Sequence, residues 1–318
     1  MNASTSSFGG SEQTVPVCFR HPGRETWVSC ARCERHICPD CMVAASVGFQ
    51  CPECVREGRK ASAAAVTAFG GTADAKGQEG LVTRLLIAIN VAVWLTGIAV
   101  ALLRGEVQGD QLGRLILTGG LTDLTQWGAA LPAISDNGQL SGGIAAGEVW
   151  RLATAMFLHY SVIHLALNMY GLWLIGQHCE YLLGRWRYLG LYVVSGLGGT
   201  VAEFMFRGPN TYPIGASGCI FGLMAALFFF FRKMKIDVRP IVTLLALNLF
   251  LGFFLANISV LAHIAGAVTG GILGALFAYV PPGRRRVLTQ VTGMALIVIV
   301  LAGLTAARIA HYGIWGVQ

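Results

Sequence analysis

The sequence has few charged residues for its length. Only 12% of its 318 residues are charged, while 54% are hydrophobic. Soluble domains carry about a quarter of their residues as charges, so this imbalance is typical of proteins that cross the membrane several times. The 41 glycines suit close helix packing in lipid.

The chain also lacks the apolar core of a secretory signal peptide near its start. Residues 1–14 are small and polar, so we expect the first membrane helix to direct insertion. The net charge of +7 raises the question of nucleic-acid binding, but the Lys and Arg residues cluster beside apolar runs. Such clusters are typical of loops that flank membrane spans. We therefore expect the lipid bilayer, and no nucleic acid, as a partner.

Cysteine is scarce beyond the first part of the chain. Seven of the nine cysteines lie at or before Cys54, so the chain has two unlike parts. The stretch between them is rich in Ala, Gly, Thr and charge, as linkers are. We predict a disordered N-terminus (1–16), a cysteine module (17–56), a linker (57–80), a membrane domain (81–310) and a C-terminal tail (311–318).

The second part contains seven apolar runs, each near the length of about 20 residues that crosses the bilayer. The predicted fold is therefore an all-α polytopic membrane protein with about seven transmembrane helices, preceded by a small module. The fourth and fifth runs are short, so their ends are poorly defined. The runs are Leu81–Leu103, Ser161–Leu182, Tyr188–Phe206, Ser217–Phe231, Pro240–Ala256, Val260–Val280 and Val287–Ile309.

The connection between the first two runs is unusually long. It extends from Arg104 to about Tyr160, and a structureless loop of that length is uncommon in a compact domain. We expect it to be partly helical and to lie on the membrane surface. Ser161 is a suitable N-cap for the second span.

Orientation follows from the basic residues. With seven spans, the loops after spans two, four and six lie on the same side as the N-terminus. These loops hold Arg185, Arg187, Arg232, Lys233, Lys235, Arg239 and residues 284–286. The positive-inside rule predicts a multi-pass protein, in the plasma membrane, with a cytoplasmic N-terminus and an outside C-terminus.

Polar residues within three spans fall at the same depth under this topology. Ser217 begins span four, His263 lies early in span six, and His164 and Asn168 lie in the outer half of span two. A serine becomes a strong nucleophile when a neutral histidine removes its proton. His164 and Asn168 are four residues apart and share one helix face, where both can donate hydrogen bonds to an oxyanion. The sequence lacks an acidic residue near His263, so we expect a dyad.

This arrangement resembles the rhomboid intramembrane serine proteases. The motifs are Trp150-Arg151, His159-x4-His164-x3-Asn168, Gly215-x-Ser217-Gly218 and Ala262-His263-x2-Gly266. The resemblance covers about residues 81–310 and implies a rhomboid-like bundle. It implies that Ser217 is the nucleophile, His263 the general base, and His164, Asn168 and the backbone N–H of Ser217 the oxyanion hole. It also implies an outward-facing water-filled cavity and membrane-spanning helices as substrates. Where many members have Tyr, this chain has Phe221, so the ring that could pack on His263 is kept and its hydroxyl is lost.

The same residues allow other interpretations. Singly, the serine and both histidines could serve in packing, and an inactive rhomboid-like protein could bind membrane helices without cutting them. A transporter or channel usually shows internal repeats or mid-span charges, and neither is evident. We expect Gly266, Gly270 and Gly274 to form a packing face that lets span six approach span four. We expect Glu180 and Glu203 to be structural or interfacial, Cys179 and Cys219 to be buried thiols, and Trp150 and Arg151 to be interfacial anchors of the first loop.

The cysteine module contains four ligand pairs, each with a two-residue gap, which lets both side chains of a pair reach one tetrahedral zinc. A disulfide framework is the alternative, and the predicted cytoplasmic location argues against it. Eight ligands satisfy two structural zinc ions, and the order resembles a cross-braced B-box-type finger in which alternate pairs share an ion. Sequential pairing stays open, and His36 is a spare candidate. A cytoplasmic protein is one partner the module could take. The pairs are Cys18/His21, Cys30/Cys33, Cys38/Cys41 and Cys51/Cys54.

Overall fold

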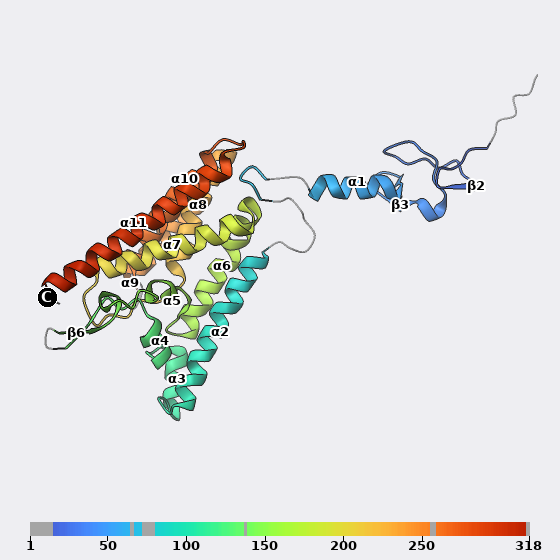
Figure 1. Cartoon of the computed structure of the whole chain (residues 1–318). Coiled ribbons are helices and arrows are strands. Elements are labelled where there is room, and N and C mark those ends of the chain that lie inside the picture. The colour runs from blue at the N-terminus through green and yellow to red at the C-terminus, as the bar shows by residue number, and fades with distance from the viewer. Residues whose placement is uncertain (1–14, 64–66, 72–79, 137–138, 255–258, 316–318) are drawn as a thin grey trace, which may run out of the picture. The chain divides into compact units, whose positions relative to one another are not determined.

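The computed structural model describes residues 15–63, 67–71, 80–136, 139–254 and 259–315. The chain forms two compact units, Met1–Ala65 and Val66–Gln318 (Figure 1). Residues 1–14, most of the segment predicted to be disordered, and residues 316–318 of the predicted tail lie outside the described residues.

The first unit consists of short elements around a core of cysteines. Strands β1 (Val17–Cys18) and β2 (His21–Glu25) form one antiparallel pair, and β3 (Val43–Ala44) and β4 (Phe49–Gln50) form another. The 3₁₀ helix η1 (Pro39–Cys41) lies between them, and helix α1 (Pro52–Ala63) ends the unit. Six cysteines and Ile37 are its buried hydrophobic side chains. Such a core is too small to stabilise a domain without metal or disulfides.

The second unit is a helical bundle whose long helices coincide closely with the seven predicted runs. Five helices are long and apolar enough to span a membrane, and a sixth span results if the bent pair Arg151–Phe157 and Val162–Leu183 counts as one. Helix α9 is apolar but shorter, so the count of seven stays a prediction. These helices are α2 (Leu81–Leu103), α6 (Val162–Leu183), α7 (Arg185–Phe206), α8 (Ser217–Met234), α9 (Arg239–Phe254), α10 (Val260–Tyr279) and α11 (Arg286–Trp315).

Helices α8 and α10 pack with their backbones almost in contact. A Cβ atom added at Gly266 would lie 2.2 Å from the carbonyl oxygen of Gly218, and one added at Gly270 would lie 2.3 Å from Cα of Gly222. A Cβ at Gly274 would lie 2.5 Å from Cα of Ala226. The prediction that these glycines form a packing face against span four is therefore confirmed.

The long first connection is partly helical, as predicted. Ordered contacts within it centre on Arg151, which is buried and donates to Glu148 Oε2 at 2.6 Å and to the carbonyl oxygen of Gln126 at 2.6 Å. Arg151 therefore braces the connection internally and is not an interfacial anchor; Trp150 is half-exposed and stacks on Trp127. The elements are α3 (Asp110–Leu117), α4 (Asp123–Gly128), β5 (Ile134–Asp136), β6 (Gln139–Gly142), η2 (Ile144–Ala146), α5 (Arg151–Thr154) and η3 (Ala155–Phe157).

Part of the predicted linker is bound to the helical bundle. Phe69 is only 1% exposed and its ring lies 4.7 Å from that of Phe230 in α8. Arg187 donates to the carbonyl oxygen of Gly70 at 3.1 Å, and Arg286 donates to that of Ala68 at 2.8 Å. Residues 67–71, here called the clip, thus join the ends of α7, α8 and α11. The interpretation of 57–80 as a plain linker missed both the clip and helix α1.

Helix bounds correct one further expectation. Helix α11 continues to Trp315, beyond the predicted start of the tail at residue 311. The predicted end of the fifth span, at Ala256, lies outside the described residues. Ser161 caps α6 as predicted, because its Oγ accepts a hydrogen bond from the backbone N–H of His164 at 3.2 Å.

Candidate functional site

A cavity of about 700 Å³ lies within the helical unit, and all four residues predicted for chemistry line it. Ser217 comes from α8, His263 from α10, and His164 and Asn168 from α6. Much of the remaining wall is apolar and belongs to α6 and α9, including Leu174, Leu247 and Leu251. Residues that are far apart in the sequence therefore line one cavity, whose wall combines polar groups with apolar side chains.

Ser217 is the first residue of α8 and is half-buried. The first backbone N–H groups of a helix have no partner within it, so they can bind a negative charge. Gly215, two residues earlier, has φ of +135°, a conformation that glycine adopts easily. A Cβ there would lie 3.0 Å from Nε2 of His164 and 3.8 Å from Oγ of Ser217. Because Gly215 has no side chain, the space beside His164 and Ser217 stays open to a substrate backbone.

His263 lies in the first turn of α10 and is 5% exposed. Its ring stacks on Phe221 of α8, with centroids 4.1 Å apart and planes 12° apart. Its Nδ1 atom is buried and has no hydrogen-bond partner among the described residues. Among the described residues, the stacking contact with Phe221 is therefore what holds the ring, and the dyad stays a prediction.

His164 and Asn168 lie one turn apart on α6, as their spacing predicted. Nδ2 of Asn168 donates to the carbonyl oxygen of His164 at 2.9 Å. The ring of His164 lies beside those of His159 and Tyr160, at centroid distances of 5.0 Å and 6.2 Å. The amide of Asn168 has a second N–H, and an imidazole N–H is a further donor. Both residues can therefore donate toward the cavity.

Sequence reasoning missed several polar residues of this cavity. Glu203 was assigned only a structural or interfacial role, and the signal that could have marked it is a carboxylate inside an apolar span, which is costly without a purpose. The signal for Ser259 is its place just before α10, where serine is a favoured N-cap. The missed lining residues include Tyr160, Glu203, Arg207, Asn248 and Ser259.

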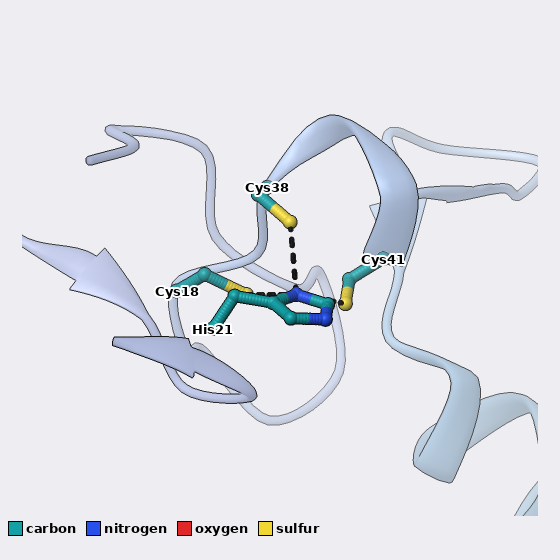
Figure 2. Close-up of side chains that lie close together, drawn as sticks. All are labelled: Cys18, His21, Cys38 and Cys41. Carbon is teal, nitrogen blue, oxygen red and sulfur yellow. Dashed lines mark hydrogen bonds between the residues drawn. The ribbon is translucent and has the colours of Figure 1, made fainter. Parts of the chain in front are cut away.

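Two Cys/His clusters form a second candidate site, in the first unit. One contains Cys18, His21, Cys38 and Cys41, and the other contains Cys30, Cys33, Cys51 and Cys54. In Figure 2 the three thiols of the first cluster surround the imidazole of His21. First and third pairs thus meet in one cluster and second and fourth in the other, as a cross-brace requires. His36 is in neither cluster; its Nδ1 lies 3.2 Å from Ser29 Oγ.

The distances within both clusters fit a tetrahedral zinc ion. Thiolate ligands about 2.3 Å from zinc lie about 3.8 Å from each other. Nδ1 of His21 is 3.7, 3.3 and 3.5 Å from the sulfur atoms of Cys18, Cys38 and Cys41, and the sulfur atoms of Cys33 and Cys51 are 3.8 Å apart. All nine cysteines are free thiols. The donor set and geometry therefore suit two structural zinc ions.

A basic residue supports the second cluster. Nε of Arg35 donates to the sulfur of Cys33 at 3.3 Å, and this hydrogen bond lowers the pKa of the Cys33 thiol. The same guanidinium forms an ion pair with Glu53 at 2.6 Å. Because zinc binds the thiolate, Arg35 favours the metal-binding form of Cys33.

Comparison with known proteins agrees with the geometry. The family model described as "Rhomboid domain" matches residues 146–280, a range that contains Ser217, His263, His164 and Asn168. "Rhomboid protease GluP" of Bacillus subtilis (strain 168) is 36% identical over 177 residues, covering 54% of this chain and 33% of the relative. "Putative rhomboid protease YdcA" of the same organism is 35% identical over 139 residues, covering 42% of this chain and 70% of the relative.

A relative with lower sequence identity, from another bacterium, is also named as a rhomboid protease. "Rhomboid protease AarA" of Providencia stuartii is 27% identical over 164 residues, covering 42% of this chain and 58% of the relative. The alignment thus spans only a third of GluP but more than two thirds of YdcA. Several of these relatives are named as proteases. Together with the apolar helices of the chain, the matches show that it is an integral multi-pass membrane protein that belongs to the rhomboid family.

Proposed function

We propose that this protein is an intramembrane serine endopeptidase that cleaves peptide bonds in or near transmembrane helices of other membrane proteins. The observation that carries the proposal is the convergence of Ser217, His263, His164 and Asn168 on one cavity from three separate helices. Ionisable and hydroxyl side chains are costly inside a membrane unless they serve a function. The apolar wall of the cavity, built by α6 and α9, suits an apolar substrate segment.

The proposed chemistry assigns one task to each group. His263 removes the proton of the Ser217 hydroxyl as its oxygen attacks the substrate carbonyl carbon. The carbonyl oxygen becomes an oxyanion, which accepts hydrogen bonds from His164, Asn168 and the backbone N–H of Ser217. His263 then returns the proton to the leaving amine, and water hydrolyses the acyl-enzyme by the same sequence of steps.

Substitution of the dyad tests the proposal. We expect Ser217→Ala and His263→Ala each to abolish cleavage of a helical membrane substrate, with the helical fold retained. The two residues act as a unit, so the double variant should be no worse than either single one. A fluorophosphonate probe should label the wild-type serine and not the Ser217→Ala protein. Full cleavage by Ser217→Ala would refute the protease assignment; absence of labelling and cleavage in the wild type would favour an inactive helix-binding protein.

We further propose that the zinc clusters are structural and that the N-terminus is cytoplasmic, in the plasma membrane. The four ligands of each cluster leave no coordination position for an activated water. The basic loops at Arg185, Arg232 and 284–286 support the orientation. A tag at Gln318 should then be labelled from outside intact cells. Labelling that requires lysis would reverse the topology and the side of cleavage.

A further inference from the structure

An ion pair lies in the wall of the same cavity, at the end of α7. Glu203 is 1% exposed, and its Oε2 accepts a hydrogen bond from Nε of Arg207 at 2.9 Å. Both residues line the cavity. A carboxylate buried this deeply is costly even when paired, and none of the chemical steps above uses it. The contact of the other carboxylate oxygen indicates the role of Glu203.

The second oxygen of Glu203, Oε1, accepts a hydrogen bond from the hydroxyl of Ser259. Ser259 is the N-cap of α10, and its Oγ also accepts from the backbone N–H of Ala262 at 3.2 Å. Nη2 of Arg207 donates to the same oxygen at 3.4 Å. A serine hydroxyl has one donor and two acceptor positions, so all three bonds form together. The hydroxyl therefore links a carboxylate on α7 to the first turn of α10.

That first turn carries His263. Its backbone N–H donates to the carbonyl oxygen of Ser259 at 3.2 Å. The side chain of His263 has no acid to orient it, because Nδ1 lacks a partner among the described residues and the ring is held by stacking on Phe221. A stacked ring can slide parallel to its neighbour. The position of Nε2 relative to Ser217 consequently depends on where the first turn of α10 is fixed.

We propose that Glu203 is a positioning residue for the general base, acting through Ser259. Its carboxylate fixes the N-cap of α10 and with it the distance between His263 and Ser217, and Arg207 compensates the buried charge. This inference rests on the proposed function. In catalytic triads an aspartate orients the histidine by direct contact. Here Glu203, three residues before the end of α7, would orient His263 indirectly, through Ser259.

Ser259 variants test the link most directly. Ser259→Ala removes the hydroxyl, whereas Ser259→Thr keeps a hydroxyl and should restore activity. We expect Ser259→Ala to lower kcat for a model transmembrane substrate at least about tenfold with little change in KM, since small misplacements of catalytic groups have large effects on rate. Fluorophosphonate labelling of Ser217 should slow in parallel. Glu203→Leu should behave as Ser259→Ala does.

A matched control separates positioning from stability. Thr122 is the N-cap of α4 and accepts from the backbone N–H of Thr125 at 3.3 Å. Thr122→Ala also removes an N-cap, but away from the cavity, so it should lower the thermal midpoint without lowering kcat. If Glu203→Leu does not fold, the Ser259→Ala and Ser259→Thr pair decides the question.

Three results would overturn the inference. Wild-type kcat in Ser259→Ala would show that the link does not position the base. Equal impairment of Ser259→Thr and Ser259→Ala would show that the hydroxyl is irrelevant, and equal loss of kcat in Thr122→Ala would show a general stability effect. Each of these leaves the protease assignment intact when Ser217→Ala is inactive. Full cleavage by Ser217→Ala would instead refute the proposed function, and this inference with it.

Discussion

The contact between α8 and α10 predicts a large effect from a very small substitution, Gly266→Ala. The added methyl carbon would lie 2.2 Å from the carbonyl oxygen of Gly218, whereas ordinary contact begins at 3.4 Å. The three atoms nearest to the added methyl all belong to the backbone of Gly218, so no side chain can move aside. The two helices must therefore separate by roughly 1 Å at this point, allowing for the usual spread in atomic contacts.

This displacement would occur next to the two residues proposed to react. Gly218 follows Ser217 directly, and Gly266 lies one turn after His263. Misplacement of a catalytic group by about 1 Å can cost on the order of a hundredfold in rate. Overpacking of a tight interior typically costs about 1–3 kcal/mol in unfolding free energy. We expect Gly266→Ala to show both effects.

The assay measures cleavage of a model substrate and thermal unfolding in detergent, beside a control on the same helix. A Cβ at Gly271 would lie 3.4 Å from the nearest atom of Phe229, an ordinary contact. Gly271→Ala should therefore keep wild-type activity and stability. If Gly266→Ala also keeps both, the close approach of α8 and α10 does not set the catalytic geometry, and the reasoning is refuted.

Three other predictions concern the oxyanion site, the metal clusters and the clip. Asn168→Ala and His164→Ala should each slow cleavage on the order of a hundredfold without abolishing it; normal rates in both would show that these residues only pack. A fragment of residues 1–65 should bind about two zinc ions and unfold in chelator. In this fragment, His21→Ala should lose one zinc ion and His36→Ala should lose none. A metal content near one ion per chain in the wild-type fragment would contradict the two-site assignment. Phe69→Ala should lower the stability of the full chain by about 1.5–3 kcal/mol, the value of burying a phenylalanine, while Phe206→Ala, 75% exposed, should change it little. A chain that begins at Lys76 should lose as much stability as Phe69→Ala does. If the wild type, Phe69→Ala and the truncated chain are equally stable, the clip contributes nothing to stability.

Local sequence was sufficient to predict most of the helices. The predicted first span, Leu81–Leu103, has the same bounds as α2, because a helix in lipid must satisfy its own backbone and therefore follows the apolar run. Ser161 and the two-residue gaps of the cysteine pairs are local signals of the same kind. Their effect depends on neighbours within a few residues, which the sequence shows directly.

The same holds in part for the cavity. The positions of Ser217, His263, His164 and Asn168 at one depth followed from span order and helix direction. Their roles in catalysis stay predictions. Phe221 was expected to pack on His263, and the stacked rings confirm that contact.

Only the tertiary structure decided the contacts between distant segments. Nothing in the sequence near Phe69 shows that Phe230 will cover it, so a bound clip could not be distinguished from a linker. Arg151 has the composition of an interfacial residue, yet its partners are carbonyl groups and a carboxylate of a folded connection. Glu203 and Ser259 are 56 residues apart. The sequence by itself therefore determined the helices, their order and the spacing of the Cys/His pairs, because these depend on local periodicity and spacing. Which buried polar group meets which partner depends on how the helices pack, and only the tertiary structure decides that.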